Sequence, residues 1–247
     1  MLPRRRRSIF TAAVFAGWAL LAISAVGTGV RAQDGLSNAQ VLANLLDVVF
    51  GSEFIGEDST VVRKWSGPMR VAIYARDPLR YRQLVLPHLD HLRRVTGLDI
   101  RLVDGSEPDQ NAYVFVFGRE QFYAYAEQHL GPGKNPRTNR FLACFGYFHA
   151  NGRRDIDEIT AVIPSFISDE EIRACVVEEV TQAIGLPNDS DSANPSIFND
   201  DDAYQDLTWQ DELFLRVLYD PRVRSGMTRA EFEPLAGRIL EELRPGS

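Results

Sequence analysis

The sequence has little of the chemistry that hydrolytic sites require. It contains two cysteines and four histidines in 247 residues, and no serine lies in a G-x-S-x-G motif. These absences argue against a serine or cysteine nucleophile. Basic residues are also in the minority, since 27 lysines and arginines face 34 acids and the net charge is -7. A chain of this charge lacks the electrostatic footprint of a nucleic-acid-binding protein.

Long hydrophobic runs are absent except near the start. Residues 9–26 carry no charge, Arg4–Arg7 precede them, and Val30-Arg31-Ala32 has the small-x-small pattern of a cleavage site. This arrangement predicts a signal peptide over residues 1–32 and a periplasmic or secreted protein with no membrane span after cleavage. An uncleaved membrane anchor is the alternative. Cleavage removes five arginines and no acid, which changes the net charge from -7 to -12.

The two cysteines, Cys144 and Cys175, favour a disulfide in an exported chain. A pair of buried thiols is the alternative. The bond would close a loop of about 31 residues and stabilise the fold by about 3–4 kcal/mol on the chain-entropy model.

The pattern of apolar residues predicts an α+β domain with a mostly five-stranded sheet over residues 67–247, because strands come early and helices late. An N-terminal helix and a linker precede it, at residues 33–66. Asn151-Gly152 predicts the turn of a hairpin. We expect strands over residues 69–75, 98–103, 112–117, 141–148 and 156–163, and helices over residues 38–50, 78–95, 119–129, 168–184 and 228–243, with one more helix after Thr208.

The helix over residues 168–184 carries the candidate site. Ser168 and Glu171 have the spacing of a capping box, and Gly185 with Pro187 ends the helix. One stripe of this helix is apolar and faces the core. A second stripe, with helical spacing, contains Glu171, Cys175, Glu178 and Gln182.

The window from Glu178 to Asp189 resembles the H-E-x-x-H-x-x-G-x-x-H motif of the zincin metallopeptidases. Glu178, Gln182 and Asn188 occupy the three histidine positions, whereas Glu179 keeps the general-base position and Gly185 the turn. The resemblance implies a zincin-like fold, with a backing helix and a site helix against the sheet, and a degenerate metal site.

A longer string is similar to an uncharacterised family of exported bacterial proteins, domain of unknown function 2927. The resemblance implies a fold and a compartment, but no activity. It includes Cys175, Glu178-Glu179, Thr181-Gln182, Gly185-Leu186, Asn188-Asp189, Ser196–Asp200, Leu207-Thr208, Leu218–Arg222 and Gly226-Met227.

The residues at the ligand positions do not suit zinc, which prefers thiolate, imidazole and carboxylate ligands. Glu178 could bind a metal and Asp189 could join it, but Gln182 and Asn188 offer only amides, so we expect no metal site. Without a metal, Glu179 has no activated water to use. Glu178 and Glu179 are then either exposed acids or part of a polar cleft, and Gln182 hydrogen-bonds the next loop. We expect His88 and His91 on the polar side of their helix.

Three hypotheses follow. The first is a non-catalytic binding or structural module of the bacterial envelope, which contacts an unknown protein or envelope ligand between strand 141–148 and helix 168–184. The second is a metal-dependent hydrolase with Glu179 as base and a nonstandard site formed by Glu178 and Asp189. The third is a calcium-dependent module, based on the acidic residues between Asp189 and Asp206, although their spacing does not fit an EF-hand. Ile197 and Phe198 are expected to anchor that loop.

Overall fold

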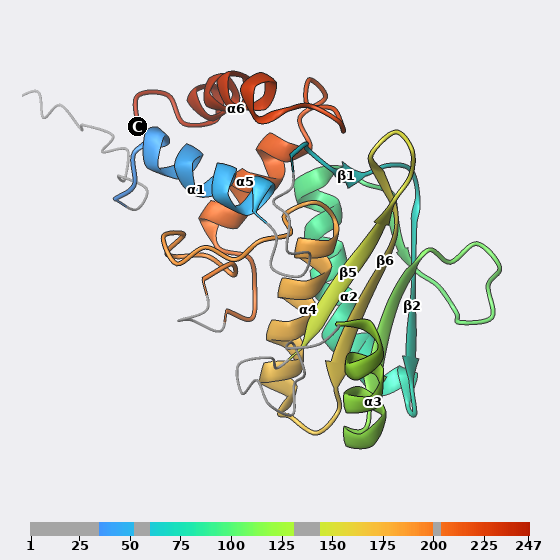
Figure 1. Ribbon diagram of the computed structural model, residues 1–247. Helices are drawn as coiled ribbons and strands as arrows, with labels where there is room; N and C mark the ends of the chain where they lie inside the picture. Colours follow the sequence, from blue (N-terminus) through green and yellow to red (C-terminus); the bar gives the residue numbers. More distant parts are fainter. Residues whose placement is uncertain (1–34, 52–59, 131–143, 200–203) are drawn as a thin grey trace, which may run out of the picture. The chain divides into compact units, whose positions relative to one another are not determined.

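The computed structural model describes residues 35–51, 60–130, 144–199 and 204–247, and Figure 1 shows the arrangement of its elements. The signal-peptide prediction for residues 1–32 lies outside the described residues. No helix in the described ranges is long and apolar enough to cross a membrane. The helices are α1 (Asn38–Phe50), α2 (Pro78–Thr96), α3 (Arg119–His129), α4 (Asp169–Ala183), α5 (Trp209–Leu218) and α6 (Arg229–Leu243), and the strands are β1 (Lys64–Trp65), β2 (Met69–Ala75), β3 (Ile100–Leu102), β4 (Ala112–Phe117), β5 (Phe145–Ala150) and β6 (Asp155–Pro164).

These elements confirm the predicted α+β class. The sheet has six strands, five of which run in the order β1-β6-β4-β2-β3 with parallel neighbours. Strand β5 pairs antiparallel with β6. The sheet has one strand more than predicted because Lys64 and Trp65 pair with the start of β6, in the segment that we expected to be a linker. Two residues are too few to show a periodic pattern in the sequence.

Most of the predicted bounds agree with the structure. The predicted limits of α1, β2, β4 and α3 are confirmed, and α2 and β6 are longer by one or two residues. The predicted hairpin is confirmed as well, with Asn151 hydrogen-bonded to Asp155 across the turn between β5 and β6. Residues 141–143, which we expected to begin this hairpin, lie outside the described residues, and β5 begins at Phe145.

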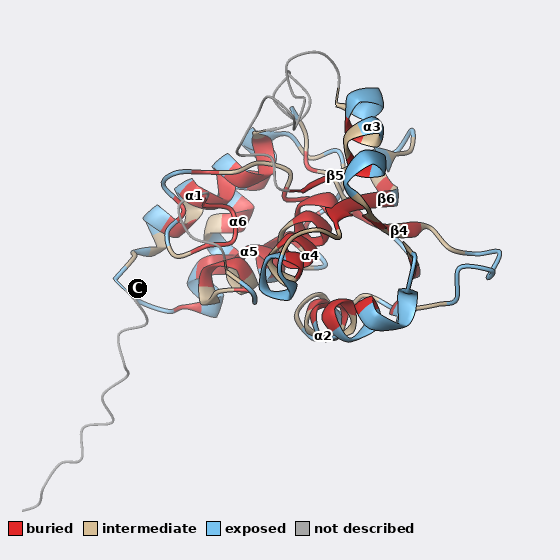
Figure 2. Ribbon diagram, turned by 90° about the horizontal axis from the view of Figure 1, so that it is seen from below, coloured by how far each residue is buried: buried red, intermediate tan, exposed pale blue. Residues whose placement is uncertain are grey.

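The two faces of the sheet carry different cores. Along β4, Val114 and Val116 belong to the larger core, to which α2 and α4 contribute, whereas Phe115 and Phe117 pack with α3 in a smaller cluster. This alternation is the normal consequence of the two-residue period of a strand. Figure 2 shows α2 and α3 on opposite sides of the sheet, with α4 on the side of α2.

The C-terminal helices hold the end of α4. The hydroxyl group of Tyr219, after α5, donates a hydrogen bond to the carbonyl oxygen of Ile184 at 2.8 Å and accepts one from the N–H of Trp65 at 3.1 Å. Gly185 follows with a φ of +132°, and a Cβ atom there would lie 2.3 Å from the carbonyl oxygen of Arg63. Glycine is required at this turn for both reasons, as the sequence indicated.

Candidate functional site

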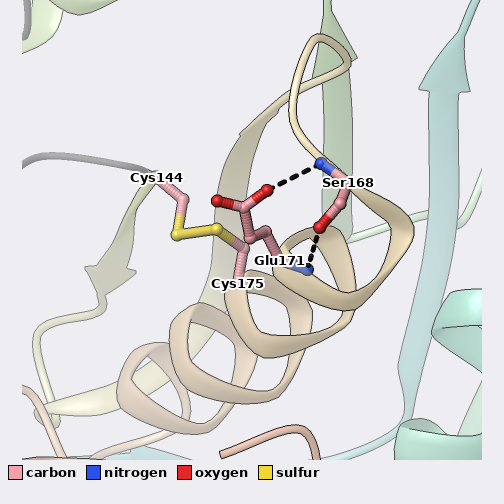
Figure 3. Close-up of a disulfide and its surroundings, with 4 residues drawn as sticks. All are labelled: Cys144, Ser168, Glu171 and Cys175. Atoms are coloured by element: carbon pink, nitrogen blue, oxygen red, sulfur yellow. Dashed lines mark hydrogen bonds between the residues drawn. A yellow bond between two sulfur atoms is a disulfide. The ribbon is translucent and has the colours of Figure 1, made fainter. Parts of the chain in front are cut away.

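Helix α4 begins at a capping box. The hydroxyl oxygen of Ser168 accepts a hydrogen bond from the backbone N–H of Glu171 at 3.2 Å, and a carboxylate oxygen of Glu171 accepts one from the backbone N–H of Ser168 at 2.7 Å (Figure 3). These bonds satisfy N–H groups that have no partner inside the helix. The hydrogen bond that the backbone N–H of Ser168 donates also lowers the pKa of Glu171, because it stabilises the charged carboxylate. The predicted capping box is confirmed.

The predicted disulfide is present. Cys175 of α4 is bonded to Cys144, directly before β5, and the two Cα atoms are 5.9 Å apart (Figure 3). Both cysteines are buried. The bond joins residues 31 positions apart and should stabilise the fold by about 3–4 kcal/mol. It fastens the edge strand β5 to the first half of α4.

Two carboxylates stand beside this disulfide. Ligand-type atoms of Cys144, Glu178 and Glu179 all lie within 4.8 Å of one another. Glu179 is only 3 % exposed, whereas Glu178 is half-buried. Within the described ranges, this is the one group of three metal-ligating side chains, and its sulfur atom already belongs to a disulfide. The group therefore contains two usable carboxylates and no thiolate.

Strand β5 approaches α4 through a glycine. A Cβ atom at Gly146 would lie 3.0 Å from Oε2 of Glu179 and 3.1 Å from the carbonyl oxygen of the same residue. Any larger residue would push the helix away from the strand. Sequence reasoning missed this contact, although a glycine inside a strand pattern is a known signal of close backbone approach.

Helix α4 is buried around most of its circumference. The predicted core stripe is confirmed, since Ile172, Val176, Val180, Ala183 and Ile184 are at most 2 % exposed. The second stripe is exposed only at its start, at Glu171: Cys175 and Gln182 are each 4 % exposed, and Glu178 is half-buried. The hypothesis that both acids are exposed is wrong for Glu179. The reason is tertiary: β5 and β6 pack against one side of the helix and α2 against another.

The polar residues that follow Glu179 bond to one another and to α1. Nε2 of Gln182 donates a hydrogen bond to Oδ1 of Asp189 at 2.7 Å, as expected for a contact with the next loop. Nδ2 of Asn188 donates to the carbonyl oxygens of Asp189 at 2.6 Å and of Asp47 at 3.3 Å. Asp189 is not part of the group formed by Cys144 and the two glutamates. These three residues connect α4 to its neighbours.

A family model described as "Protein of unknown function (DUF2927)" matches residues 38–237. The chain belongs to this family. A search of curated proteins found no match. The DUF2927 match extends from α1 into α6, so it includes the disulfide, the two carboxylates and the Gln182–Asp189 contact. The family resemblance that we inferred from the motifs of α4 and the C-terminal region is confirmed.

The histidines of this DUF2927 domain lie away from the two carboxylates. His88 is 4 % exposed, and its Nε2 is 3.1 Å from Oγ1 of Thr181 on α4. Burial, reinforced by the nearby His91, lowers the pKa of His88 to about 3. The prediction that His88 lies on a polar face is wrong, because α2 packs this face against α4. The other histidines have partners outside α4: His91 contacts Glu212 of α5, His149 of β5 contacts Asp157 of β6, and His129 contacts the carbonyl oxygen of Tyr125 within its own helix, α3.

A buried aspartate of the DUF2927 domain holds the loop after α4. Asp211 accepts hydrogen bonds from the hydroxyl group of Ser196 at 2.5 Å and from the N–H of Thr208 at 2.7 Å. Burial raises the pKa of Asp211, against the lowering effect of these bonds. Ile197 and Phe198 are 5 % and 0 % exposed, which confirms them as the anchors of the loop. Residues 200–203 lie outside the described residues, and a calcium site in this loop stays a prediction.

Proposed function

We propose that this domain is a zincin-like fold without peptidase activity, which works as a binding or structural module in the bacterial envelope. The observation that carries the proposal is the disulfide beside Glu178 and Glu179. A disulfide sulfur is not the thiolate that zinc binds. The chain has no imidazole at the positions of the zincin ligands, so Glu179 has no metal-bound water to activate.

The fold supports the architectural part of the proposal. A zincin-like domain needs a sheet, a backing helix and a site helix. Here α2 and α4 pack against the same face of the sheet, and α4 also packs against the antiparallel strand β5. The disulfide supports export, because structural disulfides persist in oxidising compartments.

The proposed contact surface is the boundary between β5 and α4, where the half-buried Glu178 lies close to the disulfide. The other polar side chains of this region make contacts within the protein. Glu179 fills the space above Gly146, and Gln182 is bonded to Asp189. A partner would therefore contact the rim of α4 and the edge strand, and would not enter a deep catalytic cleft.

Metal analysis of the purified protein tests this proposal, together with an assay of peptide cleavage. We expect no stoichiometric zinc after dialysis and no cleavage above the background of the variant Glu179→Gln. The exposed acid Glu158 provides a matched control, Glu158→Gln. The proposal is overturned by tightly held zinc together with cleavage that Glu179→Gln abolishes and Glu158→Gln leaves unchanged.

A metal-dependent hydrolase is the second candidate, and one observation favours it. The oxygens of Glu178 and Glu179 are close enough to share a hard cation such as Mg²⁺ or Ca²⁺. Asp189, the further ligand that we expected for this candidate, is hydrogen-bonded to Gln182. Cleavage that depends on added Mg²⁺ or Ca²⁺ and is lost in both Glu178→Gln and Glu179→Gln would establish the hydrolase.

A further inference from the structure

A groove of about 830 Å³ lies at the carboxyl ends of β2, β3 and β4. The first turns of α2 and α3 complete its wall, and none of its lining residues belongs to α4 or β5. In open parallel sheets, ligands bind at this edge, outside the carboxyl ends of the strands. The groove is therefore a candidate site separate from the carboxylates of α4. Its chemically distinctive lining residues are Arg76, Leu79, Arg82, Asp104, Phe117 and Gln121.

The topology explains why the sheet opens here. After β2, the chain forms α2 and returns in β3 on one side, whereas after β4 it forms α3 and then the hairpin of β5 and β6 on the other side. Because α2 and α3 cover opposite faces (Figure 2), the connections leave the adjacent strands β2 and β4 in opposite directions. This is a topological switch point, where a crevice forms between the diverging connections.

The groove carries two unpaired cations. Arg76 and Arg82 are exposed, and neither has a hydrogen bond or ion pair within the described part of the chain. In contrast, Arg80 between them pairs with Asp169 of α4 at 2.6 Å. The one acid named in the lining, Asp104, accepts two hydrogen bonds from Ser106, at 3.0 Å and 2.8 Å. The guanidinium groups of Arg76 and Arg82 are thus available for an anion, with the forked donors that suit carboxylate or phosphate.

An apolar surface adjoins these cations. Leu79 is 80 % exposed, and among the described residues it is the most exposed large hydrophobic side chain. It lies between the two arginines in the sequence and lines the same groove as the half-buried Phe117. Exposure of one leucine is ordinary by itself, but an apolar patch within a charged groove matches a ligand with both kinds of surface.

We infer that this groove binds an organic anion: Arg76 and Arg82 hold its carboxylate or phosphate group, and Leu79 and Phe117 contact its apolar body. The inference goes beyond the proposed function, because it assigns a ligand class to a site that shares no residue with the β5–α4 surface. Its test is independent of metal analysis, and either conclusion can fail without the other.

Titration of the isotope-labelled protein, followed by the backbone amide resonances, tests the inference with four probes. Phenylbutyrate and phenyl phosphate contain an anionic head and an apolar body, inorganic phosphate has only the head, and phenylbutanol has only the body. We expect the first two to shift the amides of Arg76, Arg82 and Gln121, with a Kd of about 1 mM or below for ligands of this size.

Three variants assign the roles of the side chains. The double variant Arg76→Gln/Arg82→Gln should raise the Kd of phenylbutyrate and of phenyl phosphate about tenfold or more. Leu79→Ser should raise the Kd of the probes that contain a phenyl ring and leave the Kd of inorganic phosphate unchanged. Arg94→Gln is the matched control, since Arg94 is an exposed arginine of α2 outside the groove, and it should bind like the wild type.

Three results would overturn the inference. The first is the absence of shifts in the groove with every probe at about 10 mM, well above the expected Kd. The second is an equal loss of binding in Arg94→Gln and the double variant, which would indicate only diffuse charge attraction. The third is binding of phenylbutanol as tight as that of phenylbutyrate, which would show that the anion contributes nothing.

Discussion

The α4 region and the groove at the carboxyl ends of β2–β4 both contain charged side chains, and they are built in opposite ways. Beside α4, the carboxylates of Glu178 and Glu179 lie next to a disulfide, and Glu179 is 3 % exposed. In the groove, Arg76 and Arg82 are exposed and have no partner within the described part of the chain. A buried polar group must form its hydrogen bonds inside the protein, whereas an exposed one is hydrated and remains available to bind a ligand.

A region with a recognisable sequence motif need not be the region whose charged groups are free to bind a ligand. The α4 region has the more conspicuous sequence, because the window from Glu178 to Asp189 resembles a metallopeptidase motif, but most of its polar groups are packed into contacts with β5, the next loop and α1. The groove has no sequence motif, because its residues come from strand ends and helix starts far apart in the chain. Four predictions test how firmly the two regions differ.

The largest effect is expected from removal of the disulfide. The double variant Cys144→Ala/Cys175→Ala should lower the free energy of unfolding by about 3–4 kcal/mol, because the unfolded chain gains the freedom of the opened loop. Urea denaturation measures the change. A dithiol reductant should weaken the wild type to a similar extent and have no effect on the variant. A loss below about 1 kcal/mol would show that packing alone holds β5 on α4.

The next effect concerns the close approach of β5 and α4. Gly146→Ala should lower the free energy of unfolding by about 1–3 kcal/mol, because the new Cβ would crowd Glu179 and separate strand from helix. Gly105→Ala is the matched change in the groove, where a Cβ would lie 3.6 Å from the ring of Tyr74, an ordinary contact. Gly105→Ala should lower the free energy of unfolding by no more than about 0.5 kcal/mol. Equal effects of the two changes would contradict the contrast between a closed and an open region.

The buried His88 should make the stability depend on pH. Its pKa is about 3 in the folded protein, against the ordinary value of 6.5 that it regains in the unfolded chain. As the pH falls below 6.5, the unfolded chain binds a proton that the folded protein does not accept, so stability is lost. The loss from this group is about 1.4 kcal/mol for each pH unit down toward the folded pKa.

The variant His88→Gln isolates this contribution. Its free energy of unfolding, measured by urea denaturation between about pH 6.5 and pH 5, should fall less steeply than that of the wild type. The contributions of the other titrating groups to the pH dependence are the same in both proteins and cancel when the two slopes are compared. Parallel slopes would show that His88 binds a proton as readily in the folded protein as in the unfolded chain, which would contradict the lowered pKa.

The smallest effect on stability is expected in the groove. Arg76→Gln/Arg82→Gln should change the free energy of unfolding by no more than about 0.5 kcal/mol, because neither side chain has a partner to lose. Thermal or urea unfolding measures this alongside the binding titration. A clear loss of stability would mean that the arginines serve the fold, and the contrast between the two regions would disappear.

Local patterns accounted for much of the fold and for part of the site. We could predict the capping box of Ser168 and Glu171 and the turn at Gly185, since both depend on residues that are close in the sequence. The loop contact of Gln182 was predictable for a similar reason, because Asp189 lies only seven residues away. The pairing of Cys144 with Cys175 was predictable because the chain contains only two cysteines. The strand β1 was not predictable, because two residues form no period.

Other features depend on contacts between distant segments. His88 belongs to the buried stripe of α2 only because α4 supplies Thr181 against it. Glu179 is buried in part because Gly146 lets β5 come close to α4. The groove likewise exists because α2 and α3 leave the sheet on opposite faces. An amphipathic pattern indicates which face of a helix is apolar, but not which element covers it.

The amino-acid sequence alone determined the α+β class, most element bounds, the disulfide pairing, the family and the absence of histidine between Glu178 and Asp189, because all of these are local in the chain or follow from residue identity. Only the tertiary structure decided that Glu179 of α4 is buried beside a disulfide and that two arginines line an open crevice. The physical reason is that burial and availability are set by what packs against a side chain, and those neighbours come from residues as far apart as Gly146 and Glu179, or Arg76 and Phe117.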